Sequence, residues 1–222
     1  MVLQIKYNPP YSISQWNREA FASDKYGRNF LGVPTQRRAD FAFVQHILKS
    51  MDSVTGRCAI LLPNGILNRY EEQEMRRHMV EHHFVECVIN IGKGLFYNSP
   101  MEACILICRS KPQPGREGKM LFINAVQMVT KNGNESYLTD DDIQRIADAY
   151  RAFQSQEHFC SVRTEAEILQ NDASLRVQKY VDTGVYNDAY DDVSTEDVLD
   201  EWEAAVAATH RAYDKLTAML EG

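Results

Sequence analysis

The chain lacks an apolar run long enough to cross a membrane. Its longest apolar runs, Ala59–Pro63 and Ala103–Cys108, fall far short of the roughly 20 residues that span a bilayer. The N-terminus also lacks the pattern of a signal peptide. Of the 222 residues, 44% are apolar and 25% charged, which excludes a disordered or collagen-like chain. We therefore expect a cytoplasmic globular protein.

Cysteines are few and have no metal-binding spacing. Their count of five is odd, and no two of them form a CxxC pair. Most lie in apolar runs of the kind that form strands, which is typical of reduced core residues. The sequence thus predicts neither a disulfide nor a zinc site at Cys58, Cys87, Cys104, Cys108 and Cys160.

Basic residues are too scarce for tight binding of a polyanion. The net charge is −7, and residues 181–222 hold 11 acidic side chains against Arg211 and Lys215. Residues 1–180 therefore hold 22 basic and 20 acidic side chains. Such a body can approach nucleic acid but cannot hold it by phosphate neutralisation alone. If DNA is the substrate, a partner must supply much of the affinity.

Proline is absent after Pro114, and glycine is rare after Asn134. All seven prolines lie at or before Pro114, and after Asn134 the only glycines are Gly184 and Gly222. This change predicts an α/β region followed by helix-rich sequence. In the α/β region, strand-like runs alternate with helical stretches, which predicts a partial βαβ sheet with antiparallel strands late in the order. The expected strands are Cys58–Leu62, Phe84–Ile91, Ala103–Cys108 and Met120–Val126, and the expected helices are Ala39–Ser50 and Tyr70–His83.

Capping patterns mark three helix starts. At the first of them, Glu72 is also placed to form an ion pair with Arg76, one helical turn later. The pattern at each start is a side chain that can accept from the first turn of the helix. The capping residues are Asn68 with Glu71, Thr139, and Thr164 with Glu167.

The motif with the clearest chemical meaning is Asn8-Pro9-Pro10-Tyr11, which follows a strand-like run, Val2–Tyr7. A residue before proline is extended, so Asn8 is expected at the end of the strand, facing the adjoining cleft. The prolines stiffen the turn and leave the carbonyls of Asn8 and Pro9 free to accept. The motif therefore predicts a rigid cluster of acceptors beside an aromatic ring.

Such a cluster suits an exocyclic amino group. The amino nitrogen of adenine is a poor nucleophile because its lone pair is delocalised into the ring. Two acceptors that pull on its N–H bonds favour a pyramidal nitrogen that can attack a methyl sulfonium. Tyr11 would stack on the extruded base. On these four residues alone, a plain proline turn with a surface tyrosine stays an alternative.

Further motifs accompany this one in a fixed order, over about residues 8–181. They are Gln15-Trp16, Tyr26-Gly27, ADFAFVQH at Ala39–His46, GRCAILLPNG at Gly56–Gly65, Asn90-Ile91-Gly92 and LFYNSPMEACIL at Leu95–Leu106. Together they strongly resemble the modification subunit of type I restriction-modification systems. Members of that family are adenine-N6 DNA methyltransferases that use S-adenosylmethionine and work with a DNA-reading specificity subunit. The resemblance implies a partial, Rossmann-like methyltransferase sheet of the α/β class, followed by a helical C-terminal tail.

The resemblance also implies roles for individual residues of the motif. Asn8 and the Pro9 carbonyl match the acceptors for the adenine amino group, and Tyr11 matches the stacking aromatic. These three are the expected catalytic residues. Pro10 is expected to line the pocket for the substrate base.

Four more residues match functional positions of the family. Phe96 or Tyr97 resembles the second aromatic wall of the base pocket, with core or loop packing as the alternative. Asp40 and Phe41 open a helix that lies near the cofactor in such enzymes. The alternative for this pair is a helix-end charge and a core aromatic.

The chain also departs from the family. There the glycine-rich cofactor loop and the ribose-binding acid come from strands that precede the motif, but only seven residues precede Asn8. Gly92-Lys93-Gly94 comes too late to substitute, and Gln4 and Lys6 interrupt what should be an apolar strand. We therefore expect this chain alone to be inactive and not to bind S-adenosylmethionine. We interpret residues 1–130 as the C-terminal half of the catalytic domain, 131–180 as a helical extension and 181–222 as an acidic assembly helix.

Two other functions are compatible with parts of the sequence. His78-Met79-Val80-Glu81-His82 fits the H-x-x-E-H pattern of some zinc proteases, although a solvated helix end explains it as well. The tail suggests a non-catalytic assembly module that binds the specificity subunit, with the restriction subunit as a further candidate partner. The alternative is a helix that packs back on the body of its own chain. In the tail, seven residues spaced alternately by three and four would form one face of a helix. They are Leu199, Trp202, Val206, Thr209, Tyr213, Leu216 and Leu220.

Overall fold

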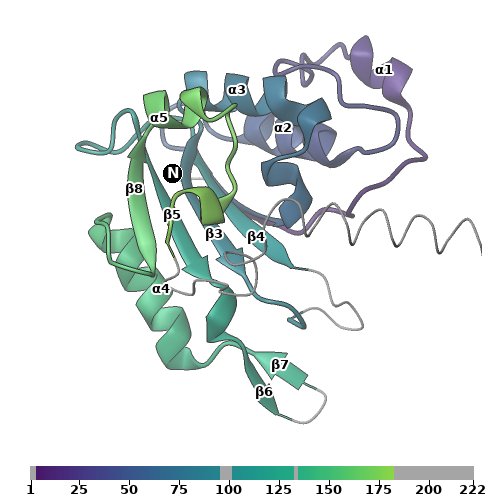
Figure 1. Cartoon of the computed structure of the whole chain (residues 1–222). Coiled ribbons are helices and arrows are strands. Elements are labelled where there is room, and N and C mark those ends of the chain that lie inside the picture. Colours follow the sequence, from purple (N-terminus) through teal and green to yellow (C-terminus); the bar gives the residue numbers. More distant parts are fainter. Residues whose placement is uncertain (1–3, 96–101, 133–134, 183–222) are drawn as a thin grey trace, which may run out of the picture. The chain divides into compact units, whose positions relative to one another are not determined.

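One mixed sheet of six strands organises the chain (Figure 1). The computed structural model describes residues 4–95, 102–132 and 135–182. In spatial order the strands are β1 (Gln4–Tyr7), β2 (Arg57–Pro63), β4 (Ala103–Arg109), β3 (Val85–Ile91), β5 (Lys119–Ala125) and β8 (Cys160–Thr164). β4 and β8 run antiparallel to their neighbours, whereas β1 pairs parallel with β2 and β3 with β5. The predicted mixed α/β sheet, with its antiparallel strands, is confirmed.

The sheet is covered on both faces, because its strands alternate their side chains between two apolar cores. Cys58, Ile60 and Leu62 of β2 belong to one core, together with Phe122 of β5. Ile89 of β3 and its strand neighbours belong to the other core. All seven residues of β3 are buried, as expected of a strand between two layers.

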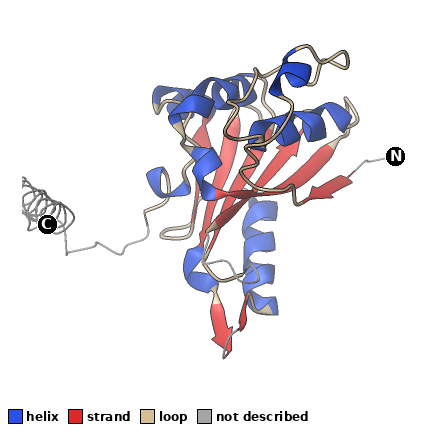
Figure 2. Cartoon of the chain, turned by 90° about the vertical axis from the view of Figure 1, so that its right-hand side faces the viewer, coloured by secondary structure: helices blue, strands red, loops and turns tan. Residues whose placement is uncertain are grey.

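Three helices cover the first face and one covers the second (Figure 2). α2 (Asp40–Ser50), α3 (Gln73–Glu81) and α5 (Glu165–Gln170) contribute to the first core, whereas α4 (Asp140–Ala152) packs on the second. The short helix α1 (Arg18–Ala22) comes between β1 and α2 in the sequence. The remaining elements are the 3₁₀ turns η1 (Asn64–Leu67), η2 (Tyr70–Glu72), η3 (Val126–Met128) and η4 (Val177–Lys179), and the hairpin of β6 (Thr130–Asn132) and β7 (Glu135–Tyr137).

The start of α3 differs from the prediction. Asn68 and Glu71 form no capping box, because the chain first makes the turn η2 and α3 begins only at Gln73. Glu72 forms its ion pair with Arg69, at 3.0 Å, and not with Arg76. Arg76 is buried and donates to backbone carbonyls, which is a tertiary role that helical spacing does not show.

The later helix starts follow the prediction. Thr139 caps α4 and Thr164 caps α5, each in a reciprocal capping box. The expected helical extension over residues 131–180 does hold α4 and α5, but it also contributes β8 to the main sheet. The predicted burial of the five cysteines is confirmed. Among the described residues, no helix is both long and apolar enough to span a membrane.

Candidate functional site

The Asn8-Pro9-Pro10-Tyr11 segment leaves the sheet at the edge where the parallel strands end. β1 stops at Tyr7, which pairs with Ile60 of β2. β2 and β3 end at the same edge, and the antiparallel β4 begins there at Ala103. The sheet therefore brings the segment beside the ends of several strands, which is where open α/β sheets bind ligands.

Within the segment, the side-chain acceptor of Asn8 is already engaged. The Tyr11 hydroxyl donates to Asn8 Oδ1 at 2.7 Å. Asn8 and Pro10 are exposed, Pro9 is buried and Tyr11 is half-buried. Burial raises the pKa of Tyr11, and neighbouring Cys104 adds to this rise, so the phenol stays protonated at neutral pH and can donate. An amino group that approaches Asn8 Oδ1 along the same direction would displace this hydroxyl, because each lone pair of the amide oxygen accepts one donor.

Asp40, the first residue of α2, contacts the chain just after the segment. Its Oδ1 accepts from the backbone N–H of Ser12 at 2.7 Å, and its Oδ2 accepts from Arg69 Nη2 at 2.9 Å. Phe41 is buried in the first core. For both residues, contact with a cofactor stays a prediction from the resemblance.

Arg69 belongs to a buried cluster of charges behind Asp40. Its Nε lies 3.0 Å from Glu72 Oε2, and its carbonyl accepts from Arg76 Nη1 at 2.8 Å. Burial raises the pKa of Glu72 to about 7, against the opposing effect of Arg69. Burial also lowers the pKa of Arg76 to about 10. Glu72 is therefore a carboxyl that changes charge near neutral pH.

Polar side chains also link the ends of β2, β3 and β4. Asn64 Nδ2 donates to Glu102 Oε2 at 3.2 Å, and Lys93 Nζ lies 3.7 Å from Glu102 Oε1. Asn90, at the end of β3, is fully buried, and neither polar atom of its amide has a partner within the described residues.

A groove lies beside β1, on the side of α1 and α2. Its volume is about 430 Å³, and its lining includes Tyr7, Trp16, Phe21, Ala42, Phe43 and His46. Such a lining can pack against an adenine ring, but none of the residues that line it is acidic. These residues therefore fit only part of S-adenosylmethionine, since a carboxylate for the ribose hydroxyls would have to come from elsewhere.

The remaining predicted site residues divide into two groups. Phe96, Tyr97 and the tail from residue 183 onward lie outside the described residues. The imidazoles of His78 and His82 instead contact backbone, with His78 Nδ1 3.0 Å from the Leu31 carbonyl and His82 Nδ1 2.7 Å from the His78 carbonyl. Within the described part of the chain, no three His, Cys, Asp or Glu residues are grouped to hold a metal ion.

Sequence reasoning missed Arg69, Glu72 and the Ser12 backbone as parts of this site. Arg69 and Asp40 are 29 residues apart, and no local pattern connects them. An arginine whose side chain is mostly covered gives no signal in the sequence, because most arginines are exposed. The contact follows only from the tertiary fold, which brings Arg69 to the start of α2.

The comparison with known families decides the assignment. A model of the family N-6 DNA Methylase matches residues 2–189. The chain belongs to the N-6 DNA methylase family. The predicted relationship to type I modification subunits is thereby confirmed at the level of the family.

Relatives of this N-6 DNA methylase chain are methylase subunits of type I restriction enzymes. It is 33% identical over 185 residues to the MjaVIII methylase subunit of Methanocaldococcus jannaschii, covering 78% of this chain and 31% of that protein. It is also 33% identical over 193 residues to the HindI methylase subunit of Haemophilus influenzae, covering 83% and 42%. The chain thus spans less than half the length of these relatives.

The fold agrees with this assignment. A crystal structure of a type I methyltransferase subunit from Streptococcus thermophilus superposes with a TM-score of 0.74 at 29% identity, over 81% of this chain and 38% of that one. The predicted methyltransferase-type fold is therefore confirmed. The zinc-protease alternative finds no support in these relationships.

Proposed function

We propose that the intact protein transfers a methyl group from S-adenosylmethionine to N6 of adenine in DNA. This chain supplies the acceptors for the amino group and the stacking aromatic. It acts as part of a type I restriction-modification methylase subunit, in complex with a specificity subunit that reads the DNA and, in the larger assembly, a restriction subunit. The names of the relatives support the assembly, and the acidic helix expected at 181–222 is the proposed contact.

The observation that carries the proposal is the hydrogen bond between Tyr11 and Asn8. Asn8 Oδ1 accepts from the hydroxyl of Tyr11 at an exposed position on the carboxyl edge of the sheet, which supports its role as an acceptor beside the aromatic ring. An amino N–H of an extruded adenine is a donor of the same kind. When it enters, the phenol releases Asn8, and the ring becomes available to stack on the base.

The chemistry asked of these residues is polarisation of the amino group. Asn8 Oδ1 and the Pro9 carbonyl accept its two N–H bonds and draw the lone pair out of the ring. The prolines hold both acceptors in place before the substrate arrives, so little reorganisation is needed. S-adenosylmethionine, when bound, supplies the methyl group.

The test is Asn8→Ala in the intact enzyme. The variant should transfer methyl groups at least about a hundredfold more slowly, with nearly unchanged DNA affinity, because the lost interaction is concentrated in the transition state. The measurements are transfer of labelled methyl to DNA and a DNA-binding titration. Asn132→Ala, in the β6–β7 hairpin, is the control for an exposed asparagine. A wild-type rate in Asn8→Ala would remove Asn8 from the mechanism.

A further inference from the structure

The chain that leaves the Asn8–Tyr11 segment is held against the start of α2. Ser12 has a left-handed backbone, with φ of 50°, and donates its N–H to Asp40 Oδ1 at 2.7 Å. The next carbonyl, that of Ile13, accepts from the Ala39 N–H at 3.0 Å. Ser12 and Ile13 are therefore hydrogen-bonded to Asp40 and Ala39, which are the first residue of α2 and its N-cap.

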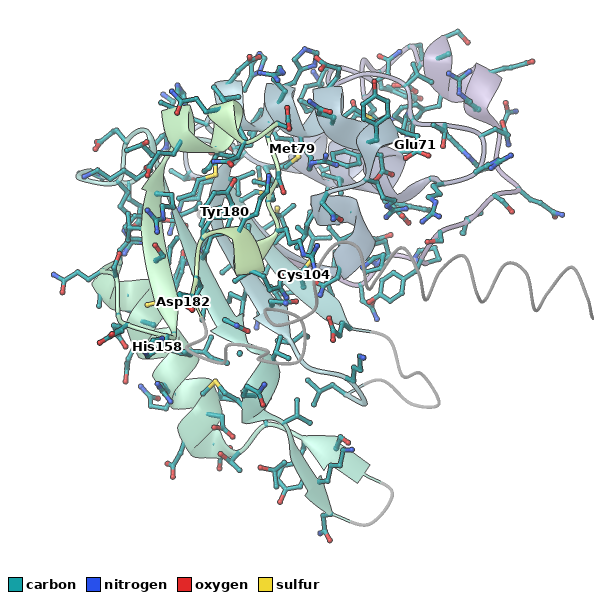
Figure 3. The ribbon with its side chains drawn as sticks, in the orientation of Figure 1. Glu71, Met79, Cys104, His158, Tyr180 and Asp182 are labelled. Carbon is teal, nitrogen blue, oxygen red and sulfur yellow. The ribbon has the colours of Figure 1, made fainter. Side chains whose placement is uncertain are left out.

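Asp40 is itself held from a third element. Its side chain is 1% exposed, and its second oxygen accepts from Arg69 Nη2 at 2.9 Å. Arg69 in turn contacts Glu72 through Nε and Arg76 through its carbonyl. Glu71, labelled in Figure 3, precedes Glu72 in the chain. Each oxygen of the Asp40 carboxylate thus accepts from one donor. The donors are the backbone N–H of Ser12 and the guanidinium of Arg69.

We propose that Asp40 and Arg69 are positioning residues for methyl transfer, which hold Asn8 and Tyr11 in register for the target base. This inference rests on the proposed function. The segment is fixed at one end by β1 and at the other by the bond from Ser12 to Asp40. Between these two points, Pro9 and Pro10 have fixed φ angles, which limits backbone rotation. The position of Ser12 therefore restricts the position of Asn8. Misplacing a reacting group by about 1 Å can cost about a hundredfold in rate.

This role differs from direct contact with the cofactor. A cofactor contact at Asp40 would raise the KM for S-adenosylmethionine when lost, whereas a positioning role lowers kcat. It also differs from a purely structural role. If Asp40 acts by placing Asn8, its removal should matter little once the Asn8 side chain is gone, because residues that act as a unit are not additive.

The experiment is a double-mutant cycle in the intact methyltransferase, with product nucleosides identified. Asp40→Ala should lower kcat at least about tenfold, with the KM for S-adenosylmethionine and the DNA affinity within about twofold of wild type. In an Asn8→Ala background the same substitution should change the rate by less than about threefold. Asp40→Asn retains an acceptor for Ser12 but loses the charge that pairs with Arg69, so its kcat should be intermediate.

Glu86→Gln is the matched control. Glu86 is also a buried carboxylate with arginine partners, Arg109 at 2.6 Å and Arg116 at 2.9 Å, but it lies at the opposite edge of the sheet. Glu86→Gln should keep the wild-type kcat even if it lowers the melting temperature as much as the Asp40 variants do. If Asp40→Ala does not fold, Asp40→Asn and Arg69→Lys carry the same test.

The outcomes separate this inference from the proposed function. Wild-type enzyme that does not methylate adenine overturns the proposed function and this inference with it. Wild-type enzyme that methylates adenine, with a wild-type kcat in the Asp40 and Arg69 variants, overturns only the inference. So do additive effects of Asp40 and Asn8, or a raised KM for S-adenosylmethionine with unchanged kcat.

Discussion

At the scale of single residues, Tyr11 has two properties that can be separated. Its hydroxyl occupies the acceptor of Asn8 in the free protein, and its ring is the proposed stacking surface for the base. In the proposed mechanism the hydroxyl would compete with the amino group of the base for Asn8, whereas the ring would stack on the base. Removing one without the other therefore tells which property matters for methyl transfer.

Tyr11→Phe should keep the methylation rate of the intact enzyme within about threefold of wild type, since the ring remains. Tyr11→Ala should lose about tenfold or more, because stacking of a base on an aromatic ring contributes about 1–3 kcal/mol. The check is the rate of methyl transfer at saturating DNA, with Tyr137→Phe as the control for an exposed tyrosine. A Phe variant as slow as the Ala variant would show that the hydroxyl, and not the ring, is required.

Which residues of the site could be foreseen depends on how local their signal is. The Asn8–Tyr11 motif and its place at a strand end could be predicted, because both follow from four adjacent residues. The bond from Ser12 to Asp40 spans 28 residues and depends on how α2 packs, so no spacing rule reveals it. Only the resemblance points to Asp40, and it does not predict the contacts of Asp40 with Ser12 and Arg69.

At the scale of elements, three strands were predictable because β2, β3 and β4 consist mostly of apolar residues. β8 was missed, since Ser161 and Arg163 interrupt its apolar pattern. The start of α3 was misplaced, because burial of Arg76 and Glu72 in tertiary contacts outweighs local capping there. Local rules therefore worked for capped, amphipathic helices such as α4 and failed where buried charges define the helix start.

Glu72 makes the stability of this turn depend on pH. Its pKa in the folded protein is about 7, raised by burial and Asp40 and lowered by Arg69, Arg76 and Arg38, against an ordinary value of 4.5. Between these values the folded state binds more protons than the unfolded state. The contribution of Glu72 to stability therefore falls as pH rises through this window.

Glu72→Gln removes this titration. Compared with wild type, the variant should gain about 1–3 kcal/mol of relative stability between pH 5 and pH 8, which corresponds to about 3–8 °C in Tm. Thermal melts of the 222-residue chain at both pH values measure this difference, and the titrations of groups that do not interact with Glu72 cancel in the comparison. A Tm difference that stays constant or shrinks as pH rises would contradict the raised pKa.

At the scale of the whole molecule, the chain covers only part of a longer type of protein. It spans 31% to 42% of the relatives in M. jannaschii and H. influenzae. Among the described strands β1 pairs only with β2, and the groove beside it presents no acidic residue. These features agree with the proposal that this chain binds the target base, whereas residues outside it bind most of the cofactor.

The chain alone should accordingly bind S-adenosylmethionine weakly or not at all, since a few contacts at the pocket edge cannot replace the hydrogen bonds of a glycine loop and a ribose-binding acid. Isothermal titration calorimetry with the 222-residue chain tests this. Micromolar affinity would show that this chain contains the main part of the cofactor site, contrary to the prediction.

The central claim is that the amino group of adenine is the methyl acceptor. The most direct measurement uses the intact protein with its specificity subunit, DNA and S-adenosylmethionine labelled in its methyl group, followed by digestion of the DNA to nucleosides and mass spectrometry. The account predicts the label in N6-methyl-2′-deoxyadenosine, and its loss in Asn8→Ala. Label in 5-methyl- or N4-methyl-2′-deoxycytidine, or no transfer to DNA, would contradict it.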